Sequence, residues 1–124
     1  MQNVIVYAPS SATRKLYHQT LSKRDCDVYK AKDMAEVLVL IATFEIDSVV
    51  IVDEGRQQHE QNLIIDLLLQ KYDHKRIVLV SPLEREIVGV ERFGSTRDFL
   101  ITSCDLLGAC HHPPLFSRFD PAKN

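Results

Sequence analysis

The chain alternates between short apolar runs rich in β-branched residues and longer stretches whose apolar side chains recur at helical spacing. This alternation limits the possible folds more than any other feature of the sequence. A strand–helix unit repeated about five times predicts a parallel sheet with helices on both faces and right-handed crossovers. With five strands, the expected fold is the flavodoxin-like, doubly wound α/β fold, in which the strands take the order 2-1-3-4-5.

The predicted elements follow from these runs. The expected strands cover residues 3–8, 26–31, 48–52, 76–80 and 98–101. The expected helices cover residues 11–24, 34–44, 57–72, 83–92 and 104–110. The fifth helix would have only about two turns, so we expect it to be short or irregular.

The C-terminal residues differ from the rest of the chain. Pro113, Pro114 and Pro121 disfavour a helix after residue 110. We therefore expect one domain over residues 1–110, followed by a proline-containing tail or linker over residues 111–124.

Composition excludes several classes of function. A net charge of −2 argues against nucleic-acid binding by this segment. No apolar run reaches the roughly 18 residues that a membrane span needs. Three cysteines without regular spacing favour a reducing, cytoplasmic location.

Asp53 is the main candidate for a functional residue. It directly follows the β-branched run Ser48–Val52, so it should lie at the carboxyl edge of the sheet, where open α/β folds bind their ligands. No Asp or Glu occurs between Met1 and Arg24, so the first strand brings no second acid to that edge. A single carboxylate is a poor magnesium site. We therefore expect no metal and no cofactor.

The pattern resembles the receiver domain of bacterial two-component response regulators. Asp53 matches the phosphoacceptor aspartate of that family, and Ser81 matches the hydroxyl residue that follows strand four and binds the phosphoryl group. Phe99 matches the aromatic residue of strand five that changes rotamer on activation, and Gly94 matches a nearby glycine.

The departures from the family pattern concern charge. The resemblance places the magnesium-binding acid pair at Ala8 and Pro9, and the invariant lysine at Thr102. The residues Asp53, Ser81 and Thr102 would therefore form a vestigial phosphoacceptor site in a pseudo-receiver. Because phosphoryl transfer depends on positioning and charge neutralisation, we expect Asp53 not to be phosphorylated efficiently. Arg56 could instead form a permanent ion pair with Asp53.

The resemblance implies a regulatory protein-interaction module that is not an enzyme, and that forms the N-terminal regulatory domain of a transcription regulator. Receivers interact through the face made by the fourth helix, the fifth strand and the fifth helix. We expect this face to bind another protein, a second copy of the chain or a fused output domain. Its expected residues are Ile87, Val88, Val90, Phe93 and Leu106.

Other interpretations remain open at this level. Asp53 could accept a phosphoryl group with an unusual acid set, or the chain could be a small flavodoxin-like ligand-binding protein. Asp53 could also serve only as a helix cap, Ser81 could simply end a strand, and Phe99 could be an ordinary core residue. The Cys104, Cys110, His111 and His112 group lacks the paired spacing of structural zinc sites.

Overall fold

A computed structural model describes residues 2–72 and 75–107, with side chains described up to residue 102. The predicted tail over residues 111–124 and the side chain of Leu106 lie outside this description. The elements are β1 (Gln2–Tyr7), α1 (Ser11–Ser22), β2 (Cys26–Ala31), α2 (Met34–Thr43), β3 (Ser48–Val52), α3 (Gln58–Lys71), β4 (Arg76–Val80), β5 (Val90–Phe93) and α4 (Thr96–Leu107).

The five strands form one parallel sheet with the order β2-β1-β3-β4-β5. This confirms the predicted flavodoxin-like fold class. The strand β3 lies at the centre, and all five of its residues are buried. Its side chains alternate between the two faces of the sheet, as a strand covered on both sides requires.

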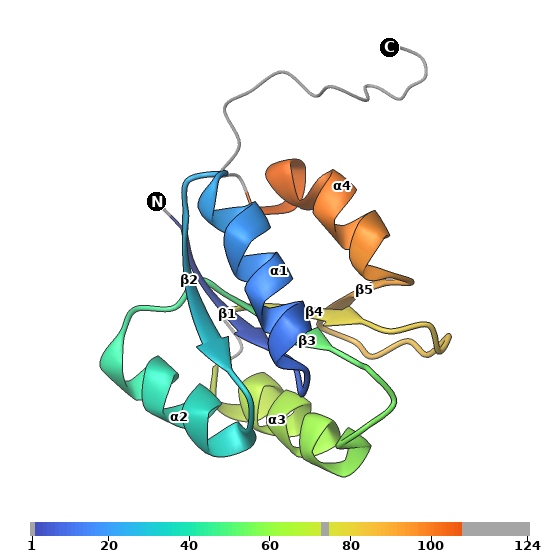
Figure 1. The fold of residues 1–124 in the computed structure, drawn as a ribbon. Coiled ribbons are helices and arrows are strands. Elements are labelled where there is room, and N and C mark those ends of the chain that lie inside the picture. The colour runs from blue at the N-terminus through green and yellow to red at the C-terminus, as the bar shows by residue number, and fades with distance from the viewer. Residues whose placement is uncertain (1, 73–74, 108–124) are drawn as a thin grey trace.

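Two helices cover each face of the sheet (Figure 1). On one face, Tyr17 and Leu21 of α1 and Phe99 of α4 pack with Val50 and Val52 of β3. The other face is covered by α2 and α3, and its core also contains Val49 and Ile51 of β3. The buried residues contributed by these two helices are Val37, Ile41, Ile64, Ile65 and Leu68.

Local sequence explains where the first two helices begin. The Ser10 side chain accepts a hydrogen bond from the Thr13 amide at the start of α1. The Asp33 side chain accepts one from the Glu36 amide at the start of α2, at 2.9 Å. Short polar side chains at these positions satisfy amides that have no partner within the helix.

The structure differs from the sequence prediction after β4. Residues 83–92 were expected to form a helix, but residues 81–89 form an irregular connection that leads into β5. Residues 98–101 were expected to form the fifth strand, but they lie within α4. The run Phe99-Leu100-Ile101 is short and apolar, and such a run is compatible with a strand or a buried helix. The Ser95 hydroxyl, which accepts from the Asp98 amide at 3.1 Å, helps to begin a helix here.

This change moves Phe99 and Thr102 onto a helix. Phe99 is fully buried and packs against Tyr17, with ring centroids 5.9 Å apart, and against Phe93, at 5.4 Å. Thr102 donates its hydroxyl to the backbone oxygen of Asp98, one turn earlier. The assignment of Phe99 to strand five was therefore wrong, and the structure gives this ring a packing role between α1, α4 and β5.

Within residues 2–72 and 75–107, no helix combines the length and apolar composition needed to cross a bilayer.

Gly89 has a specific role in the connection between β4 and β5. Its φ is +90°, and a Cβ atom added there would lie 2.9 Å from Leu69 Cδ2 of α3. We predict that Gly89→Ala lowers the free energy of unfolding by roughly 2 kcal/mol, because the alanine adds a left-handed backbone penalty and a steric contact. Urea denaturation measures this change.

Gly55→Ala is the matched control. Gly55 also has a positive φ, +78°, but an added Cβ would meet no atom within 4 Å. Gly55→Ala should lower the free energy of unfolding only by the cost of an alanine in a left-handed backbone conformation, about 1 kcal/mol. Equal losses in the two variants would show that Gly89 does not pack closely against α3.

Phe99→Ala should destabilise the domain by about 3 to 5 kcal/mol, because it removes a fully buried ring from the core. The exposed neighbour Thr102 provides the control, since Thr102→Ala removes no core packing and should change stability by less than about 1 kcal/mol. Thermal or urea unfolding of both variants makes the comparison. A loss at Phe99 as small as the loss at Thr102 would contradict the packing role.

Candidate functional site

The Asp53 carboxylate lies at the carboxyl end of β3 and is only 8% exposed. Its Oδ2 atom accepts a hydrogen bond from the Ser81 hydroxyl at 2.8 Å. Its Oδ1 atom accepts from the Gly55 amide at 2.9 Å and, at a longer 3.5 Å, from each of the Gln58 and Gln61 side-chain amides. Both oxygens are therefore occupied by donors from this chain, with the two glutamine contacts the weaker ones.

All four donors are neutral, yet they keep Asp53 ionised. Burial by itself raises the pKa of this carboxyl group. The hydrogen bonds from the Gly55 amide, the Ser81 hydroxyl, Gln58 and Gln61 outweigh burial and lower the pKa below its ordinary value. The cause is hydrogen bonding to the charged form.

Ser81 joins Asp53 to the neighbouring strands. Its side chain is fully buried, and its hydroxyl also accepts from the Leu83 amide at 3.1 Å. Its own amide donates to the Phe93 backbone oxygen of β5 at 2.9 Å. Ser81 thus contacts Asp53 at the end of β3, Phe93 at the end of β5, and Leu83 in the connection that follows β4.

Thr102 does not take part in this arrangement, because it lies on α4 and bonds within that helix. The last residue pair between β4 and β5 is Val80 with Phe93. The residue that directly follows β5 is Gly94. Gly94 brings no amine to the site.

The end of β1 carries no acid and is held by Arg14. Ala8 is fully buried, and the Arg14 guanidinium donates to the backbone oxygens of Ala8 at 2.6 Å and Pro9 at 3.0 Å. The structure shows that Arg14 reaches back to the loop before α1.

Glu54, next to Asp53, was not identified from sequence as a residue that links elements. Its carboxylate accepts from the Ser10 amide at 2.9 Å and from the Thr13 hydroxyl at 2.6 Å. It therefore supplies a negative charge at the N-terminus of α1, a helix whose own first turn contains no acid. Only tertiary structure brings a residue of the β3–α3 loop to this helix.

Arg56 does not pair with Asp53. Among the described residues, no cation lies within ion-pair distance of the Asp53 carboxylate. The Arg56 side chain is exposed, and its backbone oxygen accepts from the Gln61 side chain at 3.2 Å. The described part of the chain also contains no group of three or more His, Cys, Asp or Glu residues that could hold a metal ion.

Gln61 is a second residue that the sequence interpretation missed. It is fully buried in α3, and its amide nitrogen donates to Asp53 and to the Arg56 backbone. Its Oε1 atom has no hydrogen-bond partner in the structure. The only available signal was a glutamine at the helical spacing of the buried residues Ile64, Ile65 and Leu68.

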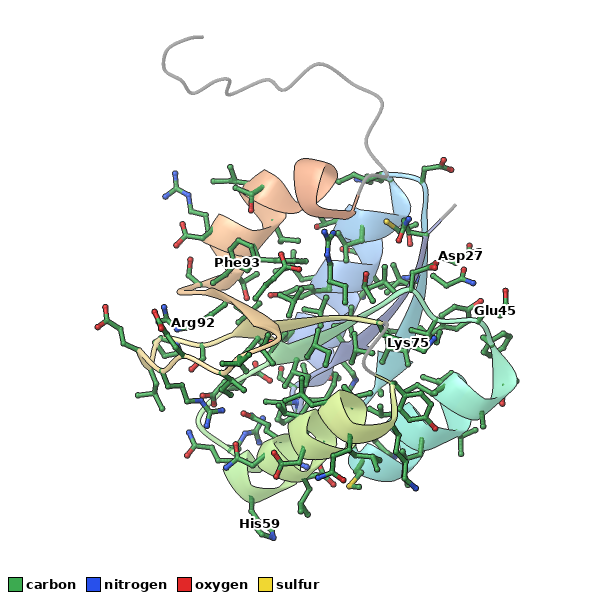
Figure 2. The ribbon with its side chains drawn as sticks, turned by 180° about the vertical axis from the view of Figure 1, so that it is seen from behind. Asp27, Glu45, His59, Lys75, Arg92 and Phe93 are labelled. Carbon is green, nitrogen blue, oxygen red and sulfur yellow. The ribbon has the colours of Figure 1, made fainter. Side chains whose placement is uncertain are left out.

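Three of the residues predicted for one interaction face lie on two sides of the sheet. Ile87 and Val90 pack with the core beneath α2 and α3, whereas Phe93 packs with the core beneath α1 and α4. Figure 2 shows Phe93 next to α4 and Arg92 on the side of the connection between β4 and β5. Val88 is 95% exposed. With no helix over residues 83–92, these side chains do not form the single face that was expected.

Comparisons with known structures identify the fold. The chemotaxis protein CheY4 of Vibrio cholerae superposes with a TM-score of 0.71 and 16% identity, over 87% of this chain and 97% of that one. The receiver domain of the Francisella response regulator 1452 gives 0.69 and 18%, over 97% and 100%. The response regulator TrrA of Thermotoga maritima, solved in complex with Mg²⁺-BeF, gives 0.67 and 16%, over 86% and 99%.

The chain has the fold of response-regulator receiver domains. The order of its sheet and the coverage of both its faces agree with these structures. No protein-family model and no curated protein sequence matches the chain. The likeness therefore lies in the fold, and the site must be interpreted from its own residues.

The lowered pKa of Asp53 predicts how stability depends on pH. Its hydrogen bonds stabilise the folded state above the unfolded pKa of about 3.9, and this contribution is lost as the pH falls through the lower folded pKa. Asp53→Asn should be less stable than the wild type at pH 7, and the difference should shrink below pH about 4. Urea denaturation across this pH range measures it. If the difference in stability between the wild type and Asp53→Asn grew as the pH fell, the lowered pKa of Asp53 would be contradicted.

Proposed function

We propose that the chain is a regulatory module with a receiver fold that acts through protein contacts, without phosphorylation of Asp53 and without catalytic activity of its own. One observation carries the proposal. Both oxygens of Asp53 are satisfied by neutral groups of the chain, while the adjoining strand ends supply no second acid and no amine.

The first missing component is a magnesium site. Magnesium in phosphoryl-transfer sites is bound by carboxylates together with phosphate oxygens in near-octahedral geometry. The loop after β1 contains Ala8 and Pro9 where the receiver pattern has its acid pair. The nearest acid in sequence, Glu54, is bound to Ser10 and Thr13 of the α1 N-terminus. Asp53 would therefore have to bind the metal without a second carboxylate.

The second missing component is a free cation to neutralise the phosphoryl group. Thr102, which the resemblance matches to the lysine, lies on α4, and Gly94, which directly follows β5, has no side-chain charge. Arg14 is engaged by the carbonyls of Ala8 and Pro9, and Arg92 by those of Ser81 and Leu83. These guanidinium groups would have to leave their backbone partners to reach a phosphoryl group.

The size of these losses supports the proposal. Removing one well-placed electrostatic group from a catalytic site costs roughly 3 kcal/mol. Removing both cation sources should slow self-phosphorylation by about 10³-fold or more. Phosphorylation would then be too slow to serve as a signal.

Exposed apolar side chains on the β4–β5 connection favour a protein partner. The fold is that of response regulators, and the connection between β4 and β5 exposes Leu83 and Val88 to solvent. Contact with a second protein or a second copy of the chain suits these exposed apolar side chains. As part of a longer protein, the module would act on an output domain that regulates transcription.

Incubation with acetyl phosphate and Mg²⁺, followed by intact-mass analysis, tests the proposal. We expect no phosphoryl adduct on Asp53 over the time in which a receiver that keeps both acids, treated in parallel, is fully modified. Asp53→Asn provides the control for modification at other residues.

The outcomes separate the alternatives. An adduct that forms at an ordinary receiver rate and is absent from Asp53→Asn would establish a working phosphoacceptor and refute the proposal. A thermal stabilisation by FMN or a nucleotide would instead favour a ligand-binding protein of flavodoxin-like fold.

A further inference from the structure

The connection between β4 and β5 is tied to Asp53 through one hydroxyl group. The Ser81 hydroxyl donates to Asp53 Oδ2 at 2.8 Å and accepts from the Leu83 amide at 3.1 Å. Because a hydroxyl has a single proton, donation to the carboxylate leaves its lone pairs free to accept from Leu83. The carboxylate thus sets the orientation in which Ser81 can bind the following loop.

Arg92 of β5 holds the same two residues from the other side. Its Nη2 atom donates to the Ser81 backbone oxygen at 3.1 Å, and its Nε atom donates to the Leu83 backbone oxygen at 2.8 Å. In Figure 2, Arg92 lies beside this connection. Residues 81–83 are therefore fixed between the ends of β3 and β5.

The rest of the connection has fewer polar contacts, and its Ile87 side chain packs with the core beneath α2 and α3. Arg85 donates to Asn62 of α3 at 3.0 Å, and Gly89 lies close to Leu69. Leu83 is 51% exposed and Val88 is 95% exposed. The connection crosses from β4 to the parallel strand β5 without a helix, so its conformation depends strongly on the contacts at its two ends.

We propose that unmodified Asp53 is a positioning residue, which holds the start of the β4–β5 connection through Ser81 and thereby fixes how Leu83 is presented to solvent. This inference deepens the proposed function and rests on it, since it requires Asp53 to remain unmodified. The ionised carboxylate accepts from Ser81 and from the Gly55 amide at the same time. In an asparagine or a protonated aspartate, one of the two acceptor positions becomes a donor. Such a side chain cannot accept from both the Ser81 hydroxyl and the Gly55 amide at these two positions.

The contact between Asp53 and Ser81 should dominate over the contact with Arg92. Ser81 is fully buried and Asp53 is nearly so, whereas Arg92 is half-exposed. Both sets of hydrogen bonds are charge-assisted, because the Asp53 carboxylate and the Arg92 guanidinium are ionised, so burial decides between them. Solvent competes with the Arg92 contacts more readily than with the buried pair.

Amide hydrogen exchange followed by NMR tests the inference at Leu83. Ser81→Ala removes the acceptor of the Leu83 amide, and we expect exchange there to be about tenfold faster. Asp53→Asn leaves the hydroxyl in place but loses its orientation, and we expect exchange to be roughly three- to fivefold faster. Ser81→Thr retains a hydroxyl and should keep exchange within about twofold of the wild type.

Two controls separate this effect from general destabilisation. The amide of Val37, in α2 on the far side of the sheet from α1, reports global opening, so its exchange should become faster only by as much as urea denaturation shows each variant to be destabilised. The amide of Leu83 opens locally and should exchange faster than that of Val37 in every variant. Arg76→Ala removes the exposed ion pair with Glu91 on the same two strands, and should leave Leu83 unchanged.

The double variant Asp53→Asn with Ser81→Ala decides whether the coupling runs through Ser81. If it does, Asp53→Asn should not further change the exchange rate of the Leu83 amide in the Ser81→Ala background. The inference would be overturned if Asp53→Asn increased the Leu83 exchange rate equally in the wild type and in Ser81→Ala. It would also be overturned if Asp53→Asn alone left that rate unchanged. Phosphorylation of Asp53 by acetyl phosphate would refute the proposed function and leave these exchange rates as they are, so the two failures can be told apart.

Discussion

An ionised carboxylate at the end of the central, fully buried strand is the constraint on which the candidate site depends. Asp53 follows β3, whose five residues are all buried, so its charge cannot be satisfied by bulk water. The chain meets this requirement with four neutral donors from the β3–α3 loop, α3 and the end of β4. These donors bind the side chain strongly enough to keep it charged, and they join three elements around one group.

The charges near this edge are used to hold the chain together. Glu54 binds the N-terminus of α1, Arg14 binds the loop that precedes the same helix, and Arg92 binds the start of the β4–β5 connection. Each of these groups contacts backbone or a hydroxyl instead of remaining available to a ligand. The edge of the sheet where a doubly wound fold usually binds its ligand is thus built largely from internal contacts.

Much of the fold could be predicted from the sequence, and the failures have a common cause. The four strands through residue 80 were assigned to within one residue at each end, and the start of α2 at Met34 was also predicted. Runs of β-branched residues mark β1, β3 and β4. After Val80 the apolar residues are fewer and the runs shorter. Val90–Phe93 has only four residues, with apolar side chains at its two ends alone, whereas Phe99-Leu100-Ile101 is a continuous apolar run. A periodicity argument favours the second run as a strand, and packing against Tyr17 makes it a helix.

The sequence by itself determined the class of fold, its strand order and the position of Asp53 at the carboxyl edge, because these follow from local apolar patterns and from the connection rules of parallel sheets. The resemblance placed Ser81 in the same site as Asp53, and the two residues directly follow the paired strands β3 and β4. Tertiary structure alone decided what surrounds that pair. The contacts of Gln61, Glu54 and Arg14 join residues on different elements, and their geometry depends on how helices dock on the sheet, which no local pattern in the sequence records.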